Sequence, residues 1–317
     1  MTRSALIRSQ LGIQTVADTP VAATVQLPGL LTMRHAPNRL LREEYRNSWG
    51  GSNVHDDLRL ESTGQYVGRC TASTLIYWLS AAIRGNPTVT GAGPYTHAYI
   101  QPLTGAIPPL KYLTAYWGDD AGALCAPGVV VSRIVIEGAN DAAWTIRADL
   151  LGMGVVAGSF AALTTITNET VKNLLTSLFV DSTWAGIGGT LKTGLGYGFT
   201  WTWDSGIAGD FTMSNQLNRT DIHRAIPNTT LQLRLKWNAD STVLAVDTIN
   251  LTRKFIRLQN TGTVNSVIRI DGAYDPMTMD TVADQTDGTT RATLDLVAVE
   301  DTARKVEVTV TNNVASV

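Results

Sequence analysis

A His-Asp-Asp run is the first feature whose residue types could do chemistry. Residues 54–59 read VHDDLR, and a His-Asp pair could serve metal-dependent phosphoester hydrolysis. That reaction needs further histidine and aspartate ligands at helical spacing. The chain has only four histidines, and none are spaced i, i+2 or i, i+4: His35, His55, His97 and His223. The run is therefore interpreted as a polar loop beside a strand.

A glycine-rich segment and an aromatic stripe come next. Residues 189–199, GTLKTGLGYGF, lack the glycine order of a dinucleotide fingerprint, and their lysine is misplaced for a phosphate-binding loop. Residues 199–204, FTWTWD, put Phe199, Trp201 and Trp203 on one face of a strand. Such a stripe could stack on a sugar, although tryptophans more often fill cores and interface hot spots. We keep sugar binding as an alternative to core or interface packing.

The acidic clusters and the cysteines carry little chemistry. GDDAG (118–122) and VADQTDG (282–288) lack the spacing of a calcium loop and are interpreted as turns. Cys70 and Cys125 form no C-x-x-C pair, so free thiols are expected and neither a zinc site nor a disulfide. No catalytic triad or dyad is readable. We therefore expect no enzyme, no cofactor and no bound metal.

Composition favours a β-rich protein that is partly covered by its own copies. Of the 317 residues, 44% are hydrophobic and only 16% charged, below the quarter or so that is usual. The formal net charge is −2 without a basic stripe, so sequence-reading DNA binding is not expected. Residues 1–20 contain no long apolar run, and no apolar segment reaches membrane-spanning length, so we expect neither a secretory signal nor a membrane anchor.

Two helices are predicted from apolar stripes at helical spacing. The first spans Gln65–Arg84, with Leu75, Ile76 and Leu79 on one face and Gly85 after its end. The second spans Asn168–Val180. Its stripe consists of Val171, Leu174, Leu175, Leu178 and Phe179.

Most other segments alternate with a period of two, which predicts antiparallel strands with one buried face. Two hairpins of similar pattern stand out, VVVSRIVIEGANDAAWTIRADLL (129–151) and TTLQLRLKWNADSTVLAVDTINL (229–251). Each follows a predicted helix and two further strands, so the pattern recurs after roughly a hundred residues. This predicts a duplicated β unit, with a first domain over 1–154 and a second over 155–317. Residues 264–312 supply three more strands, the last two as a hairpin.

Several segments together resemble the tail tube proteins, or major tail proteins, of long-tailed bacteriophages. The similarity covers approximately residues 25–310, and its motifs are strand patterns with few fixed residues. One motif ends D-L-x-G-x-G, with Asp149, Leu150, Gly152 and Gly154. The matching segments are GQYVGRCTASTLIYWLSAAIRG (64–85), GPYTHAY (93–99), IPPLKYLTAYWG (107–118), 129–154 and FTMSNQLNR (211–219).

The resemblance implies a mainly β fold, an antiparallel β-sandwich or half-barrel with flanking helices. Six such domains would form a ring whose inner strands close into a barrel, and rings would stack into a hollow virion tube that delivers DNA into the host. A duplicated chain would form a homotrimeric, pseudo-hexameric ring, and otherwise a homohexamer. The implied partners are sister copies, the tape-measure protein, tail terminator and distal tail proteins, and double-stranded DNA passing without sequence-specific binding. The tail would be assembled in the host cytoplasm.

Residues 34–57 form a long, charged, Gly-containing stretch that we expect to be irregular. The resemblance implies that this loop contacts the adjacent ring, and the alternative is a mobile surface loop. Its charged candidates for ring contact are Arg34, Arg39, Arg42, Glu43, Glu44 and Arg46. A tube that conducts DNA should be lined by polar or acidic strand faces, for which the candidates are Glu137, Asp149 and Asp247.

Two other functions remain open at this point. One is a related ring-forming component of an injection machine or a distal tail protein, which would share the fold but form single rings. The other is a carbohydrate-binding β-sandwich that uses Trp201 and Trp203.

Overall fold

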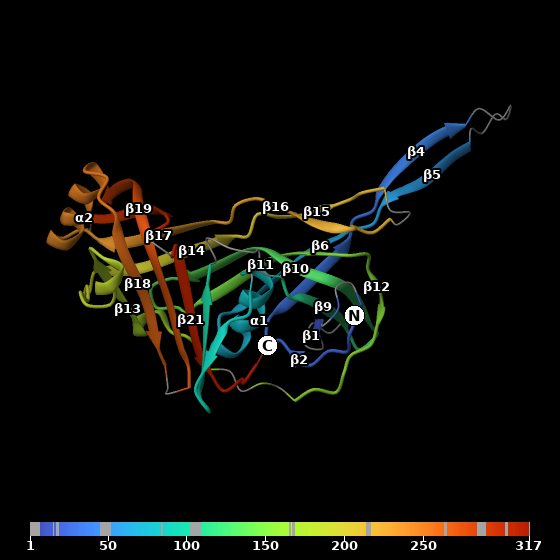
Figure 1. Cartoon of the computed structure of the whole chain (residues 1–317), viewed down its shortest axis with the longest axis horizontal. Coiled ribbons are helices and arrows are strands. Elements are labelled where there is room, and N and C mark those ends of the chain that lie inside the picture. Colours follow the sequence, from blue (N-terminus) through green and yellow to red (C-terminus); the bar gives the residue numbers. More distant parts are fainter. Residues whose placement is uncertain are drawn as a thin grey trace.

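The fold is mainly β with two α-helices and antiparallel strand pairing (Figure 1). In the computed structural model the described residues are 7–14, 16, 19–44, 52–83, 85–101, 109–164, 166, 169–213, 217–262, 265–283, 290–301 and 304–316. The first half contains β1 (Arg8–Gln14), β2 (Val25–Gln26), β3 (Leu30–His35), β4 (Asn38–Glu44), β5 (Ser52–Arg59), β6 (Ser62–Arg69), α1 (Ala72–Ala82), β7 (Thr88–Thr90), β8 (Tyr95–Ile100), β9 (Tyr112–Asp119), β10 (Gly122–Gly138), β11 (Thr145–Gly152) and β12 (Val156–Gly158). The second contains two short 3-10 turns, η2 (Asn173–Leu175) and η3 (Trp184–Gly186), with β13 (Thr176–Asp181), β14 (Gly196–Asp204), β15 (Ile207–Asp210), β16 (Asp221–Arg224), β17 (Asn228–Lys236), α2 (Ala239–Ile249), β18 (Lys254–Thr261), β19 (Val267–Ala283), β20 (Thr290–Ala298) and β21 (Val306–Asn312).

Eight of these strands form one continuous antiparallel sheet, here called the central sheet. Its order is β3–β6–β11–β10–β14–β17–β20–β19. The long strands β10 and β19 bend out of it at bulges. The first half of β10 pairs with β9 and β12, and the first half of β19 pairs with β18 and β21. Traced through the described residues, these pairings never return to their starting strand, so one chain forms no closed barrel.

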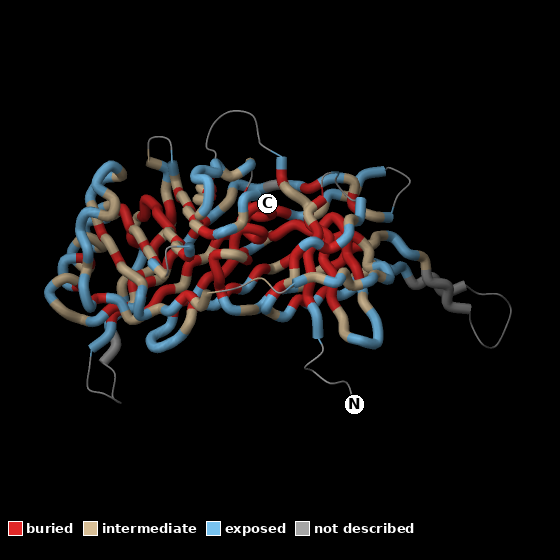
Figure 2. The backbone as a smooth tube through the Cα atoms, turned by 90° about the horizontal axis from the view of Figure 1, so that it is seen from below, coloured by how far each residue is buried: buried red, intermediate tan, exposed pale blue. Residues whose placement is uncertain are grey.

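The core lies on one face of the central sheet and runs without a break along the long axis (Figure 2). Period-two alternation places most of the apolar side chains of the central strands on that face. Trp201 and Trp203 of β14 are 0% and 1% exposed, and their stacked rings have centroids 6.4 Å apart. The aromatic stripe is therefore core. Its exposure for sugar stacking, the alternative kept from the sequence, is wrong.

The first predicted helix is confirmed only in its second part. Residues 62–69 form β6 instead, because Gly64 and Gly68 allow close packing under Met33 and Tyr66 while Tyr66 enters the core. α1 then begins after Thr71 and is buried on nearly all sides. Strands β8 and β21 cover its outer side, where Tyr99 Oη donates to Ile76 O at 3.0 Å. This helix therefore lies inside the molecule rather than at a sheet edge.

The second predicted helix, Asn168–Val180, is wrong. Its described part contains η2 followed by β13, in which Leu178 and Val180 are the buried side chains. β13 pairs with β18 over Thr176–Asp181. In so short a segment the same apolar residues fit both the helical period of about 3.6 and the strand period of two. Hydrogen bonding to β18 favours the strand.

The second predicted hairpin is wrong in its latter half. Residues 228–236 form β17, but α2 follows where the return strand was expected. Asn238 starts α2 with a capping box: its side chain accepts from Ser241 N, and Ser241 Oγ accepts from Asn238 N. The repeat at a displacement of roughly a hundred residues therefore fails.

The C-terminal strands exist, but they do not form the predicted hairpin with each other. β20 pairs with the second half of β19, and β21 pairs with the first half of the same strand. β21 also pairs with β8 from the first half of the chain. The last strand therefore ties the two halves together instead of decorating the second one.

A structural repeat is nevertheless present, in a different register. The pairing series β1–β9–β10–β11–β6–β3 matches β13–β18–β19–β20–β17–β14 strand for strand. A helix follows the fifth strand of each series, starting at Ala72 and at Ala239, a displacement of 239 minus 72, or 167 residues. A two-stranded hairpin, β4–β5 or β15–β16, precedes that same fifth strand. Each half thus has one architecture, although the division at residue 154 stays a prediction.

Candidate functional surface

Among the described residues, the histidines, cysteines and carboxylates lie apart from one another. Within the described ranges no three His, Cys, Asp or Glu side chains gather as metal ligands. Cys70 and Cys125 are both buried free thiols. Burial raises the pKa of Cys70 to about 12, and it also raises the pKa of Cys125, so neither is a ready nucleophile. His97 is buried, and its Nε2 lies 2.7 Å from Val314 O, where it holds the C-terminal segment.

The outer face of the central sheet, opposite the core, is polar and of mixed charge. Arg133 of β10 lies directly across from Asp149 on one side and Asp204 on the other. Glu137 is exposed on the same strand between Thr145 and Thr200. Positive and negative side chains alternate on this face and offset one another. The face therefore carries no large patch of one sign of charge.

Two of the three candidate lumen residues share this polar face, and the third does not. Glu137 is exposed on β10, and Asp149 is half-buried on the adjacent β11, where Arg147 Nε lies 3.4 Å from its carboxylate. Asp247 belongs to α2 rather than to a strand, and Lys254 Nζ lies 2.8 Å from its Oδ2. Its assignment to a strand face is therefore wrong.

The described parts of residues 34–57 form the end of β3 and the two strands of a hairpin, so the expected irregular loop is wrong for them. β4 and β5 pair antiparallel from Asn38–Arg59 to Glu44–Ser52 and project away from the body as an arm (Figure 1). At its base Arg39 Nε donates to Asp57 Oδ1 at 2.6 Å, whereas Arg34 lies before the arm on β3, 3.5 Å from Thr63 Oγ1. Of the other charged candidates, Arg42, Glu43 and Glu44 occupy β4 positions, and Arg46 lies outside the described residues.

A second arm, which the sequence did not reveal, lies across the polar face. β15 and β16 pair antiparallel and run beside the base of the first arm (Figure 1). Leu60 N donates to Leu217 O at 2.8 Å, and the Arg59 guanidinium lies over the Phe211 ring, 4.6 Å from its centroid. The two strands have only four residues each, and Gly206 and Gly209 weaken their period of two, which explains why the sequence did not predict an arm there.

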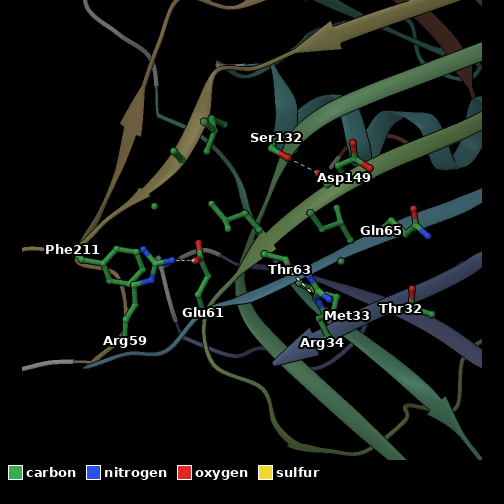
Figure 3. A pocket seen from close by; sticks show the side chains of 16 residues that line it. Thr32, Met33, Arg34, Arg59, Glu61, Thr63, Gln65, Ser132, Asp149 and Phe211 are labelled. Carbon is green, nitrogen blue, oxygen red and sulfur yellow. Dashed lines mark hydrogen bonds and ion pairs between the residues drawn. The ribbon is translucent and has the colours of Figure 1, made fainter. Parts of the chain in front are cut away.

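A groove of about 770 Å³ lies between this second arm and the central sheet (Figure 3). Arg59 bridges its mouth, with one side toward Phe211 and the other 3.3 Å from Glu61 Oε2. The sheet side is lined mainly by Thr32, Arg34, Thr63, Gln65, Ser132 and Asp149. The arm side is Ile207–Gly209 and Phe211. The groove is thus an open space between two parts of one chain rather than an enclosed ligand cavity.

Within the described residues, the central sheet ends in two unpaired strand edges. β3 pairs with β6 on one side only, and the second half of β19 pairs with β20 on one side only. Unpaired edges expose backbone donors and acceptors and readily accept a strand from another chain. α2 adds apolar exposure near one of these edges, through Val243, Val246 and Ile249.

The family-model and curated-protein comparisons identify no relative of this chain. Within the described residues, neither helix has the length and apolarity needed to cross a membrane. No protein-family model matches the chain, and no curated protein matches its sequence.

Proposed function

We propose that this chain is the tail tube protein of a long-tailed bacteriophage. Sister copies join through their sheet edges into a ring, and rings stack into a hollow tube through which DNA passes into the host. The observation that carries the proposal is the central sheet itself. It is backed by a continuous core and polar on its other face, its strands β10 and β19 bend out of it at bulges, and within the described residues it is unpaired at both ends.

Closure into a ring would pair the exposed edge strands of such a sheet. A barrel removes exposed edges, and a contact between two different edges closes into a ring when its rotation permits. The free edges belong to different strands, β3 and β19, so the contact is of this head-to-tail kind. With a duplicated architecture in each chain, three chains supply six similar units, which is the ring that the resemblance implies.

The part of the polar face that the second arm leaves open is suited to line a conduit. DNA presents a dense row of phosphates, and every uncompensated arginine or lysine on the wall would hold one of them. On this face Arg133 lies between Asp149 and Asp204, and Arg147 is 3.4 Å from Asp149. A cation with a carboxylate beside it, such as Arg147, binds phosphate more weakly than a free one, which favours sliding of the DNA over sticking.

A second function, a ring-forming injection-machine component or distal tail protein, uses the same edges. It differs in stacking, because such a protein forms single rings that do not elongate. Carbohydrate binding through Trp201 and Trp203 is excluded by their burial.

Light scattering over a concentration series tests the proposal. A tail tube protein is expected to pass from the monomer to a closed ring and then to masses that grow without limit as concentration rises. A single ring mass that stays constant would instead identify the second function. A mass that remains monomeric at every concentration would overturn both.

A further inference from the structure

The repeat shows, inside one chain, how one half joins the next. The second half of β10 pairs with β14 from Arg133–Asp204 to Gly138–Phe199. Ser205 N donates to Ser132 O at 2.8 Å, which makes Ser132–Ser205 a hydrogen-bonded pair. Pairs alternate along an antiparallel ladder, so Val135 and Thr202 form a non-hydrogen-bonded pair. We call this contact the internal joint.

Each partner in the internal joint has a counterpart that is unpaired. In β10 the first residue after the register shift is Arg133, which pairs with Asp149 of β11. In β19 the first residue after the register shift is Thr278, which pairs with Asp295 of β20. Thr278 therefore corresponds to Arg133. Arg69 and Lys236 end β6 and β17, three residues before the helices α1 and α2.

The same counting assigns the counterpart of β14. Because β6 corresponds to β17, Thr63 corresponds to Thr230. Thr63 pairs with Arg34 of β3, and Thr230 pairs with Thr202 of β14, so Arg34 corresponds to Thr202. β3 is thus the counterpart of β14, and the second half of β19 is the counterpart of the second half of β10. In the internal joint these positions are paired, whereas in β3 and β19 they are bare.

Resting on the proposed function, we propose that the second half of β19 in one copy pairs antiparallel with β3 of the next copy, in the register of the internal joint. Transferring that register places Met279 opposite His35, Asp280 opposite Arg34, Thr281 opposite Met33, and Val282 opposite Thr32. This contact is called the intermolecular joint. It makes β19 and β3 the two ends of one repeating interface.

The backbone of β3 is oriented for this pairing. Ala36 N donates to Glu61 O at 2.7 Å, so by alternation the N–H groups of Met33 and His35 point away from β6. Leu31 N also points outward and already donates to Ser9 Oγ at 3.0 Å. The Ser9 hydroxyl therefore ends the available edge, and the intermolecular joint extends from Thr32 toward Ala36.

Only this register places the positive charge on the β3 edge opposite the negative charge on the β19 edge. Arg34 and Asp280 are both exposed, and the proposed pairing sets them directly opposite each other. Opposite charges across a strand pair stabilise it, whereas like charges destabilise it. A slip by one residue would place Asp280 opposite an apolar or neutral side chain and turn Met279 toward the polar face.

A second groove supports the same joint independently. The groove beneath the second arm is lined by Thr32, Arg34, Thr63, Gln65, Ser132 and Asp149. The counterparts of these residues one unit later line another groove, of about 460 Å³. They are Thr200, Thr202, Thr230, Gln232, Met277 and Asp295.

Only the first groove has its own arm. The first is covered by Ile207–Phe211 of the second arm, and within the described residues no arm covers the second groove, where Met277 is 61% exposed. The first arm is the counterpart of the second, since Arg39–Asp57 and Ile207–Arg224 are corresponding pairs. The base of the first arm, beginning at Arg39, therefore occupies the second groove of the neighbouring copy. This places the base of residues 34–57 within a ring rather than between rings.

Cysteine cross-linking tests the register of the intermolecular joint. Asp280 and Arg34 correspond to the non-hydrogen-bonded pair Val135–Thr202, and Cα atoms in such pairs lie about 4.5 Å apart, within disulfide range. The matched variant is Arg34→Cys/Asp280→Cys, and the shifted control is Arg34→Cys/Val282→Cys. Thr32→Cys/Val282→Cys is a second matched pair that keeps the two charges. Both native cysteines are buried and unreactive.

Oxidation of the assembled protein, followed by non-reducing electrophoresis, gives the readout. Matched pairs are expected to give at least about tenfold more covalent oligomer than the shifted pair, whose side chains lie a further two residues apart. Rings in micrographs with no preference between matched and shifted pairs would overturn the joint and leave the proposed function intact. No rings with any variant or with the unmodified chain would overturn both.

Two further variants test the charges and the groove. Arg34→Asp and Asp280→Arg alone are each expected to reduce ring formation, and the double variant Arg34→Asp/Asp280→Arg is expected to restore it. Met277→Arg is expected to block the groove, whereas Leu191→Arg, at a similar exposure of 51%, serves as the matched control. Failure of the double variant to assemble although it folds, together with normal rings from Met277→Arg, would overturn the proposed contacts.

Discussion

Asn312 in the last strand is hydrogen-bonded to Ala72 at the start of the first helix. Asn312 Nδ2 donates to Ala72 O at 2.8 Å, the pair is buried, and 240 residues separate the two. Together with the pairing of β21 with β8, this bond closes the chain end over α1. We therefore expect the two similar halves to unfold as one unit.

Replacing Asn312 with alanine removes a buried donor and leaves the Ala72 carbonyl unpaired. We expect Asn312→Ala to lower the free energy of unfolding by about 1–3 kcal/mol. Urea denaturation should still show a single transition, followed by far-ultraviolet circular dichroism and tryptophan fluorescence together. Asn313→Ala, at an exposed neighbour, is the matched control and should change little. Two separate transitions in the unmodified chain would contradict the single unit.

The tryptophans of β14 are expected to act through packing alone. Trp201→Ala leaves a large cavity in the core and should cost about 3–5 kcal/mol of folding stability, measured by chemical denaturation. Trp184→Ala, at a half-buried position on η3, should cost much less. Wild-type stability in Trp201→Ala together with a loss of glycan binding would contradict the core assignment.

Burial of Cys70 predicts that stability falls at high pH. Its pKa is about 12 in the folded chain, against 9.0 for a free thiol, because desolvation penalises the thiolate. Below pH 9 the thiol is neutral in both states, and its full contribution to stability is present. From pH 9 toward 12 the unfolded state ionises first, so folding stability is lost as pH rises. Burial raises the pKa values of Tyr66, Tyr99 and Tyr274 as well, which adds loss above pH 10.

Melting temperatures between pH 7 and pH 11 measure this loss. Cys70→Ala should flatten the decline between pH 9 and pH 10, where the tyrosines contribute least. An unchanged slope in that variant would show that Cys70 does not contribute. In the folded chain at pH 8 neither cysteine should react with a thiol reagent within minutes.

Reversing charge on the polar face should create DNA binding where the proposal expects none. Glu137→Lys adds a cation, and Asp149→Lys adds one and also releases Arg147 from its ion pair, so assembled rings of either variant should bind a short duplex with salt-dependent affinity. Glu300→Lys, at an exposed site beyond the end of β20, is the control. Fluorescence anisotropy at several salt concentrations gives the slope. Equal binding by all three variants would contradict a lumen formed by this face.

The sequence predicts strands well where one face of the sheet is covered. In β10, β11 and β17 apolar residues alternate because the core lies on one side and polar contacts on the other. α1 was predicted only in part, because β6 precedes it without a proline or a helix-stop signal. α2 was missed because Thr242, Val243 and Val246 favour strands, whereas the decisive Asn238 capping box is local side-chain chemistry.

The repeat and the candidate surface depend on contacts between distant segments. The repeat is invisible in residue identity, and only the order of strand pairing and the two bulges reveal it. The second arm is formed from two four-residue strands with weak period, and its position over β10 and β11 follows from tertiary packing. Glu137 and Asp149 were placed on strands correctly, whereas Asp247 alternates like a strand residue but lies on a helix.

Negative-stain electron microscopy of the concentrated protein tests the central claim most directly. If bare edges on β3 and β19 are satisfied by sister copies, class averages should show rings with a central hole, and side views should show stacked rings forming tubes. Fields that contain only compact single particles of the size of one chain, at concentrations well above those in a cell, would contradict the account.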